Sequence, residues 1–573
     1  MKNVLHRFLS ESSEHLIFVF KKINNLPLKT KLFALCAIVF VVGVFTILWK
    51  VNQNFLITIP DRGGTLREGV VGFPRFINPV LSFSNTDNDL ASLIYSGLMK
   101  TTPDGNLTPD LAESYEVSED GKIYTFTLKK GLVFHDNTPL TTDDIAYTIE
   151  RIQDSLIKSP RQSRWDSVST EVIDEYTIRF ILQQPFSPFI DGTTVGILPR
   201  HIWEHTNHEQ FAQSFLNISP IGTGPYKIKE IINRSGLPVS FILESFEEYA
   251  LGIPYIKQIE FSFYSTEEDL FEAVKRGEIE STHDLSPANY SAIKGKRVIH
   301  TTPLSRIFGI FFNQTKQDIF LDKRVRQAVS LAIDRKKVIN DALGGYGIAT
   351  DSPVPPQEVP TDNVSYYDTD HAHNLLLESD WNKNLETGIY EKKSQPLSFT
   401  IVTGNNPELI SVATALQEDL RTFGIEVIIQ SFDQTTLNQN YIRQRDYEAL
   451  FFGLAIGRGM DLFPFWHSSQ RNDPGLNVSL YANNDVDSST EKARQTTSRE
   501  ERALFIQQTI DKIKEDAPAA FLYTPLFTYA IPEKLNNVML GNIDTPSERF
   551  RGVHTWYIET DKVWKFFKED NNN

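Results

Sequence analysis

Residues 111–149 read LAESYEVSEDGKIYTFTLKKGLVFHDNTPLTTDDIAYTI, and this stretch carries most of the information about the fold. Tyr124, Phe126 and Leu128 alternate with two threonines, which predicts a strand with one apolar face. Gly131 is expected to turn the chain into a second strand at residues 133–135. The stretch therefore predicts a hairpin in which one face is buried.

The same stretch continues into a helix. Thr141 or Thr142 is the expected N-cap, because a threonine hydroxyl accepts a hydrogen bond from the free N–H groups of the first turn. Asp143 and Asp144 follow in that turn, where negative charge complements the helix dipole. These carboxylates are therefore explained as helix-start residues rather than as catalytic groups.

This run of residues resembles the signature of the family 5 extracellular solute-binding proteins, the dipeptide, oligopeptide and nickel receptors of ABC importers. The shared elements are Asp-Gly followed by Tyr-Thr-Phe, then Phe-His-Asp and a Pro-Leu-Thr step. Asn137 stands where the family usually has glycine, and asparagine tolerates the left-handed conformation better than most residues. By this resemblance the stretch belongs to a scaffold for extended ligands.

Further motifs extend the resemblance over roughly residues 65–565. They are Asn78-Pro79, Tyr95-x-Gly97-Leu98, Leu198–Trp203, Pro220–Lys227, Phe320–Arg335, Asp461–Ser468 and Tyr481–Asp487. Independently of the resemblance, the strand–helix–strand order of residues 399–427 favours a parallel α/β lobe.

The resemblance implies an α/β fold of the two-lobed periplasmic-binding-protein type II, with an extra inserted subdomain. Lobe I is expected to comprise residues 65–98, 222–305 and 517–565, and lobe II residues 306–516. The inserted subdomain of lobe I is expected at residues 99–221. With 573 residues, of which 40% are hydrophobic, the chain is long enough for several lobes.

Residues 32–49 contain no charged side chain and are long enough to cross a bilayer. Six Lys and Arg precede this stretch and Lys50 follows it closely, so residues 1–31 are expected to form a cytoplasmic tail. Residues 50–64 are predicted as a linker to an extracytoplasmic domain. The alternative is a cleaved signal peptide, but no small-x-small site follows the apolar run.

The cysteine and charge content restrict the function further. Cys36 is the only cysteine; Leu35 before it and the apolar residues after it argue against a lipidation site. The net charge is −16, while residues 1–50 carry seven Lys and Arg against two Glu, so the remainder is more acidic still. An acidic surface of this kind disfavours nucleic-acid binding.

The resemblance also implies where a ligand would bind. The expected contacts lie in a segment before a helix, on a strand that crosses between the lobes and in a loop of lobe II: Phe83, Ser84, Asn85, Phe308, Phe311, Asn313, Gly457, Arg458, Asp461 and Trp466. In peptide receptors of the family an aspartate in this loop holds the ligand ammonium, but Gly457 stands near that position. Arg458 would favour an anionic group, or it is simply an exposed loop residue.

The function implied is a receptor that captures peptides or another small solute for an ABC permease and its ATPase, while residues 32–49 attach it to the membrane. No cofactor is expected. One alternative is a solute sensor that signals through the tail. Another is a zinc peptidase, because His201, Glu204 and His205 have H-x-x-E-H spacing. A five-residue match arises easily by chance, and no catalytic or metal site is therefore predicted.

Overall fold

The computed structural model describes residues 27–293, 295, 297–356 and 367–565. The chain divides into two compact units. One unit comprises residues 1–61 and 559–573, and the other comprises residues 62–558. They are described separately below.

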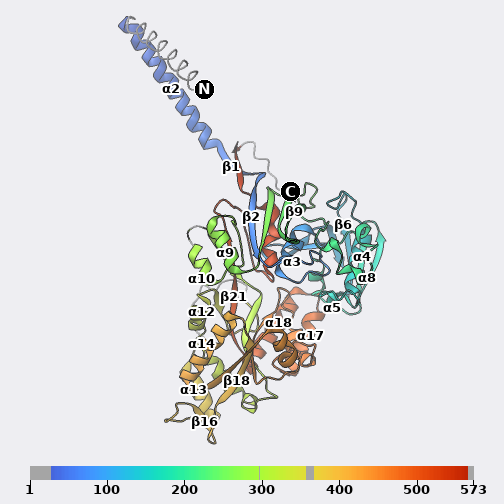
Figure 1. Cartoon of the computed structure of the whole chain (residues 1–573), viewed down its shortest axis with the longest axis vertical. Helices are drawn as coiled ribbons and strands as arrows, with labels where there is room; N and C mark the ends of the chain where they lie inside the picture. Colours follow the sequence, from blue (N-terminus) through green and yellow to red (C-terminus); the bar gives the residue numbers. More distant parts are fainter. Residues whose placement is uncertain (1–26, 294, 296, 357–366, 566–573) are drawn as a thin grey trace. The chain divides into compact units, whose positions relative to one another are not determined.

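The first unit consists of a long apolar helix and a two-stranded ribbon (Figure 1). Helix α2 runs from Leu28 to Phe55 and contains the predicted span; its Leu28–Asn52 part is long and apolar enough to cross a membrane. Strand β1 (Leu56–Asp61) follows without a break and pairs antiparallel with β22 (Glu559–Trp564). The predicted linker at residues 50–64 is therefore wrong, because these residues continue the helix and form strands. Most of the predicted tail lies outside the described residues.

The first sheet of the second unit has the order β2-β11-β10-β9. Strand β2 pairs parallel with β11, and the other neighbours are antiparallel. The elements around it are β2 (Gly63–Val71), α3 (Asn85–Ile94), β9 (Tyr226–Arg234), β10 (Leu237–Ser245), β11 (Ile256–Tyr264), α9 (Glu267–Arg276) and α10 (Pro287–Ile293).

The inserted subdomain contains a four-stranded antiparallel sheet in the order β5-β6-β8-β7. Its elements, together with the small β3/β4 pair, are β3 (Met99–Thr101), β4 (Leu107–Pro109), β5 (Ala112–Val117), β6 (Ile123–Leu128), α4 (Thr142–Gln153), α5 (Gln162–Trp165), β7 (Val168–Asp174), β8 (Thr177–Leu182), α6 (Phe189–Gly192), α7 (Arg200–Trp203) and α8 (His208–Phe211). Tyr124, Phe126 and Leu128 are buried, as their alternation predicts.

Two details of the opening stretch can be compared with its prediction. Thr141 is the N-cap of α4, and its backbone N–H donates to the Asp144 carboxylate at 2.9 Å, so the predicted helix start is confirmed. The predicted strand at residues 133–135 is wrong. Val133 forms only an isolated bridge to Pro139, because the chain reverses tightly there, with Asn137 at φ 68°. The partners of β6 are β5 and β8 instead.

The third sheet is mixed and follows the order β12-β21-β13-β20-β18-β19, with β14 also paired to β21. Strands β18 and β19 are parallel, as their strand–helix–strand order predicts. The strands are β12 (Val298–Pro303), β13 (Arg306–Phe312), β14 (Gly347–Ala349), β18 (Ser398–Gly404), β19 (Glu426–Phe432), β20 (Ala449–Ala455) and β21 (Ala519–Ile531). A small separate sheet comprises β15 (Asn382–Lys383), β16 (Tyr390–Lys392) and β17 (Gln395–Pro396).

Helices cover both faces of this sheet, because successive side chains of its strands point to opposite faces and each face packs into its own apolar core. Ile310 and Phe312 belong to one core, whereas Ile307 and Phe311 belong to the other. The first core contains side chains of α11 (Lys323–Leu331), α12 (Arg335–Leu343), α13 (Thr369–Glu378) and α14 (Pro407–Phe423). The second contains side chains of α16 (Phe463–Trp466), α17 (Asn484–Gln495) and α18 (Arg499–Asp516).

Lobe I and the inserted subdomain share one apolar core, to which residues near the C-terminus also contribute. Strand β21 links this core to lobe II: Ala520 and Leu522 pack in lobe II, whereas Phe527 and Tyr529 pack in lobe I. The 3-10 helix η5 (Pro546–Thr555) then contributes Phe550 and Val553 to the lobe I core. Residues of β21 and η5 thus complete the apolar core of lobe I.

Candidate functional site

A cavity of about 550 Å³ lies where lobe I meets the inserted subdomain. Its walls come from α3, β3, residues 160–165, residues 191–196 and η5. The volume falls within the range of about 300–1,000 Å³ that is usual for small-molecule sites. The cavity is therefore the candidate functional site.

Several polar atoms of the cavity wall have no hydrogen-bond partner among the residues that the structure describes. They are Oδ1 of Asp110, the Tyr95 hydroxyl and Nε of Arg551, and all three residues are at least nine-tenths buried. Lys100 lies beside them and donates from Nζ to the Tyr249 hydroxyl at 3.1 Å. Because a buried polar group without a partner is costly, these atoms mark the wall as a place where a ligand would supply the missing bonds.

The charged groups of the wall titrate differently from groups in water. Burial raises the pKa of Asp110, and the neighbouring Lys100 ammonium opposes that shift. Burial lowers the pKa of Lys100, and Asp110 opposes that shift in turn. Burial also raises the pKa of Asp191 against the opposing effect of Arg164. Acidic and basic groups therefore both line this cavity, and their shifted pKa values reflect partial removal from water.

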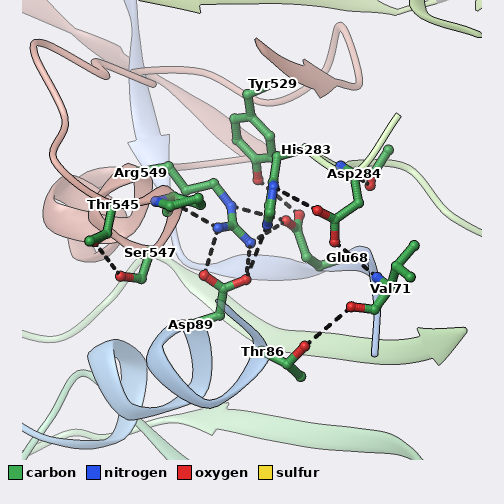
Figure 2. Close-up of polar contacts among 12 residues, drawn as sticks. Glu68, Val71, Thr86, Asp89, His283, Asp284, Tyr529, Thr545, Ser547 and Arg549 are labelled. Atoms are coloured by element: carbon green, nitrogen blue, oxygen red, sulfur yellow. Dashed lines mark hydrogen bonds and ion pairs between the residues drawn. The ribbon is translucent and has the colours of Figure 1, made fainter. Parts of the chain in front are cut away.

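A buried ionic cluster holds two walls of the cavity together (Figure 2). Arg549 of η5 donates to both carboxylate oxygens of Asp89 on α3, at 2.8 and 2.7 Å, and from Nη2 to Glu68 of β2 at 2.9 Å. All three side chains are completely buried. The Tyr529 hydroxyl donates to the second oxygen of Glu68 at 2.8 Å. The cluster therefore fixes α3 and η5 relative to β2.

His283 and Asp284 extend this ionic cluster. His283 lies 3.4 Å from Asp89 through Nε2 and 3.0 Å from Asp284 through Nδ1. Burial acts to lower the pKa of His283, but Asp284 and Asp89 outweigh burial and raise it to about 9. Although burial acts to raise the pKa of Asp89, Arg549 and His283 hold it below its usual value. The histidine is thus protonated at neutral pH.

Arg458, at the end of a lobe II loop, reaches the rim of the cavity. Its guanidinium donates to Glu548 at 2.8 Å and to the Thr101 hydroxyl at 3.0 Å, and both of these residues line the cavity. Its backbone N–H donates to Asp544 at 3.1 Å. Since only 14% of the side chain is exposed and it pairs with Asp544 and Glu548, the alternative that Arg458 is an exposed loop residue is wrong. Its role as a ligand contact stays a prediction.

The other predicted contacts lie in different places. Phe83 lines the cavity and is 68% exposed, Ser84 is the N-cap of α3, and Asn85 begins that helix. Phe311, Asn313 and Trp466 are buried inside lobe II, where the Asn313 amide donates to two backbone carbonyls. These three do not line the cavity, and their role as ligand contacts stays a prediction.

The last three predicted contacts are also in lobe II. Phe308 stacks on Tyr523 with 4.9 Å between ring centroids, Gly457 has φ +71°, and Asp461 forms a bidentate ion pair with Arg494. The cavity residues that the sequence did not reveal are Lys100, Asp110, Tyr249 and Arg551. They come from four separate segments, and none of them belongs to a catalytic or ligand motif.

The H-x-x-E-H spacing does not produce a metal site. Helix α7 ends at Trp203, so Glu204 and His205 do not continue one helical face with His201. His201 contacts Asp136 at 2.8 Å, and the His205 side chain is 86% exposed. Among the described residues, no group of three or more His, Cys, Asp and Glu is placed to hold a metal ion.

Comparison with known proteins assigns the chain to a family. Residues 106–474 match the model of the bacterial extracellular solute-binding proteins, family 5. The chain belongs to this family. As a family 5 solute-binding protein it is 28% identical over 514 residues to the oligopeptide-binding protein AppA of Bacillus subtilis (strain 168), covering 87% of this chain and 92% of that protein. Members of the family are receptors for solutes rather than enzymes.

Solved structures agree with this family 5 fold. The structure of AppA from Bacillus subtilis in complex with a nonapeptide matches with a TM-score of 0.67 at 28% identity, covering 87% of this chain and all of that one. The ABC transporter substrate-binding protein CtaP of Listeria monocytogenes matches with a TM-score of 0.73 at 26% identity, with the same coverage. The predicted α/β fold is thereby confirmed.

Proposed function

We propose that this family 5 protein is a membrane-anchored receptor that binds peptides in the cavity between lobe I and the inserted subdomain. It would deliver them to an ABC permease driven by its ATPase. The similarity to AppA, whose structure contains a nonapeptide, supports peptides as the ligand class. The fold supplies the scaffold, and the cavity wall supplies the recognition groups.

The observation that carries the proposal is the pairing of opposite charges with unpartnered polar atoms around one cavity. A peptide is a zwitterion whose backbone offers both donors and acceptors. The carboxylate of Asp110 accepts hydrogen bonds, whereas Lys100 and Arg551 donate them. A purely apolar ligand would leave these buried groups without partners, which costs binding free energy.

Attachment to the membrane is supported by the way α2 ends. An apolar helix near the N-terminus is also compatible with a cleaved signal sequence. However, α2 passes directly into β1, and the side chain of Asn52 in its last turns accepts a hydrogen bond from Trp564 of the C-terminal strand. Retention of the helix therefore preserves a structure formed by both ends of the chain.

The test uses the full chain in lipid nanodiscs and a mixture of peptides of three to nine residues. Native mass spectrometry should detect bound peptide masses, and the intact mass should include residues 1–55. Asp110→Asn should weaken peptide binding, whereas Phe215→Ala, at an exposed site away from the cavity lining, should not. Equal binding by both variants would reject this cavity as the site, and absence of any bound peptide would reject the ligand class.

A further inference from the structure

We infer that Arg161 and Arg164 bind the C-terminal carboxylate of the peptide and so give the ligand a fixed direction in the cavity. Both residues line the cavity, Arg161 as the N-cap of the short helix α5 and Arg164 within it. The inference rests on the proposed function, because it places one end of a ligand whose class that proposal names.

Arg161 is held in place by Ser82, a buried residue that also lines the cavity. Nη1 of Arg161 donates to the Ser82 carbonyl oxygen at 2.9 Å, and Nη2 donates to the Ser82 hydroxyl at 3.1 Å. These bonds use two of the five N–H groups that a guanidinium carries. Neutral partners therefore position the Arg161 guanidinium, and it keeps donors that a ligand can use.

Arg164 extends along the cavity wall over Gly192. A Cβ at position 192 would lie 2.9 Å from Cδ of Arg164, so the glycine leaves room for the arginine side chain. Gly192 is buried and also lines the cavity, whereas Arg164 is exposed. The Arg164 guanidinium is therefore accessible to a ligand in the cavity.

The two guanidinium groups carry more positive charge than the acid beside them neutralises. Neither arginine forms an ion pair within the part of the chain that the structure describes. Burial, together with the charge of Arg164, lowers the pKa of Arg161 to about 10. Asp191 lies in the same wall, but Arg458 and Arg502 act on its carboxylate as well as Arg164. An added anion is therefore stabilised at this place, whereas an added cation is repelled.

The terminal carboxylate is the part of a peptide that suits these two arginines. A guanidinium presents parallel N–H groups that match both oxygens of a carboxylate. The N-terminal ammonium has the wrong sign of charge, and backbone amides have no net charge to balance two guanidinium groups. Asp110 in the same cavity has an oxygen free to accept from the N–H donors of the peptide. The carboxylate therefore goes to Arg161 and Arg164.

The test compares randomised peptides that end in a free acid with the same peptides that end in an amide. The peptides have three to nine residues and lack Asp and Glu, so the terminal carboxylate is the only one they carry. Mass spectrometry of peptides released from the full chain in nanodiscs gives the ratio of bound acid to bound amide within one preparation, so that the folded fraction cancels. The wild type should favour the acids by about tenfold or more, because the amides leave charged donors without a charged acceptor.

Variants of the two arginines test the assignment. Arg161→Gln and Arg164→Gln should each reduce the preference for acids severalfold, and the double variant should abolish it. The matched control is Arg179→Gln, which removes an arginine that pairs with Glu171 at 3.0 Å on the surface and should keep the wild-type preference. N-acetylation of both sets of peptides should leave the preference unchanged, because the arginines bind the other end.

The outcomes separate this inference from the proposed function. Equal binding of acids and amides by the wild type would overturn the inference and leave the peptide receptor intact. A preference that survives in the double variant would also overturn it, since other residues would then hold the carboxylate. If neither set of peptides binds, the proposed function is rejected and the inference is rejected with it.

Discussion

Replacing Arg549 by methionine should destabilise lobe I strongly, because it removes the guanidinium that pairs with both buried carboxylates and leaves His283 as the neighbouring cation of Asp89 alone. The two carboxylates have no exposure and together accept four hydrogen bonds from this guanidinium. Loss of one partner of a buried ion pair typically costs about 3–5 kcal/mol. At 1.4 kcal/mol per factor of ten, the openings that expose α3 and η5 to solvent should become about a hundred- to a few-thousand-fold more frequent.

Hydrogen exchange followed by mass spectrometry measures this effect locally, which matters because a two-lobed protein need not unfold in one step. Exchange should accelerate in residues 85–94 and 546–555 while α14 of lobe II stays protected. The matched control is Arg276→Met, which removes an arginine that pairs with Glu278 at 2.7 Å on the surface. Adding Asp89→Asn to Arg549→Met should restore part of the protection, because one unpaired charge is then removed.

The result that refutes this reasoning is equal exchange in Arg549→Met and Arg276→Met. The buried ionic cluster would then contribute no more than a solvated pair, and α3 and η5 would be held by apolar packing alone. Acceleration of exchange in both lobes to the same extent would also refute it, because the cluster would then not act through the cavity walls.

Three further predictions concern pH, the interlobe contact and a close backbone approach. The pKa of His283 is raised from 6.5 to about 9, so its protonated form contributes on the order of 3 kcal/mol to the free energy of unfolding; this contribution is complete below pH 6.5 and is lost as the pH rises towards 9. The stability difference between the wild type and His283→Gln, followed by thermal unfolding, should therefore shrink between pH 6.5 and 9. A difference that stays constant over this range would contradict the assignment. Arg458→Ala should release peptide roughly tenfold faster in stopped-flow measurements because a part-buried charged hydrogen bond to Glu548 is lost, whereas Arg443→Ala, at an exposed arginine, should match the wild type. Gly222→Ala should lower the free energy of unfolding by about 1–3 kcal/mol, since its Cβ would lie 2.1 Å from the Ile94 carbonyl oxygen. Denaturant unfolding should show no comparable loss for Gly552→Ala, because a Cβ at that position would make only ordinary van der Waals contacts at 3.7 Å.

Local patterns in the sequence were sufficient to predict much of the fold. Alternation predicted β6, and the Thr141–Asp144 spacing predicted the start of α4, because both features depend on residues close in sequence. The linker at residues 50–64 was mispredicted because β1 exists only through its pairing with residues some 500 positions away. The strand at residues 133–135 failed for the related reason that neighbouring strands already occupy both edges of β6.

The candidate site was harder to predict than the fold. Phe83 was predicted as a ligand contact from the resemblance and it lines the cavity, whereas Asp110 and Lys100 carry no such signal in the sequence. Asp110 directly follows Pro109 of β4, and only the fold shows that one of its oxygens has no hydrogen-bond partner within the described part of the chain. Phe311 and Trp466, also predicted as ligand contacts, are buried in an apolar core of lobe II and do not line the cavity.

The division of the lobe I core between distant parts of the chain has a consequence for biosynthesis. Glu68 and Arg549 are separated by 481 positions, whereas the lobe II cores draw on residues from 307 to 523, apart from the gap at 357–366 that the structure does not describe. The ribosome and the secretion machinery therefore deliver every lobe II segment before η5 emerges. A nascent chain that stalls before residue 549 holds Glu68 and Asp89 with no arginine to neutralise them, so the buried ionic cluster can form only after nearly the whole chain has been made.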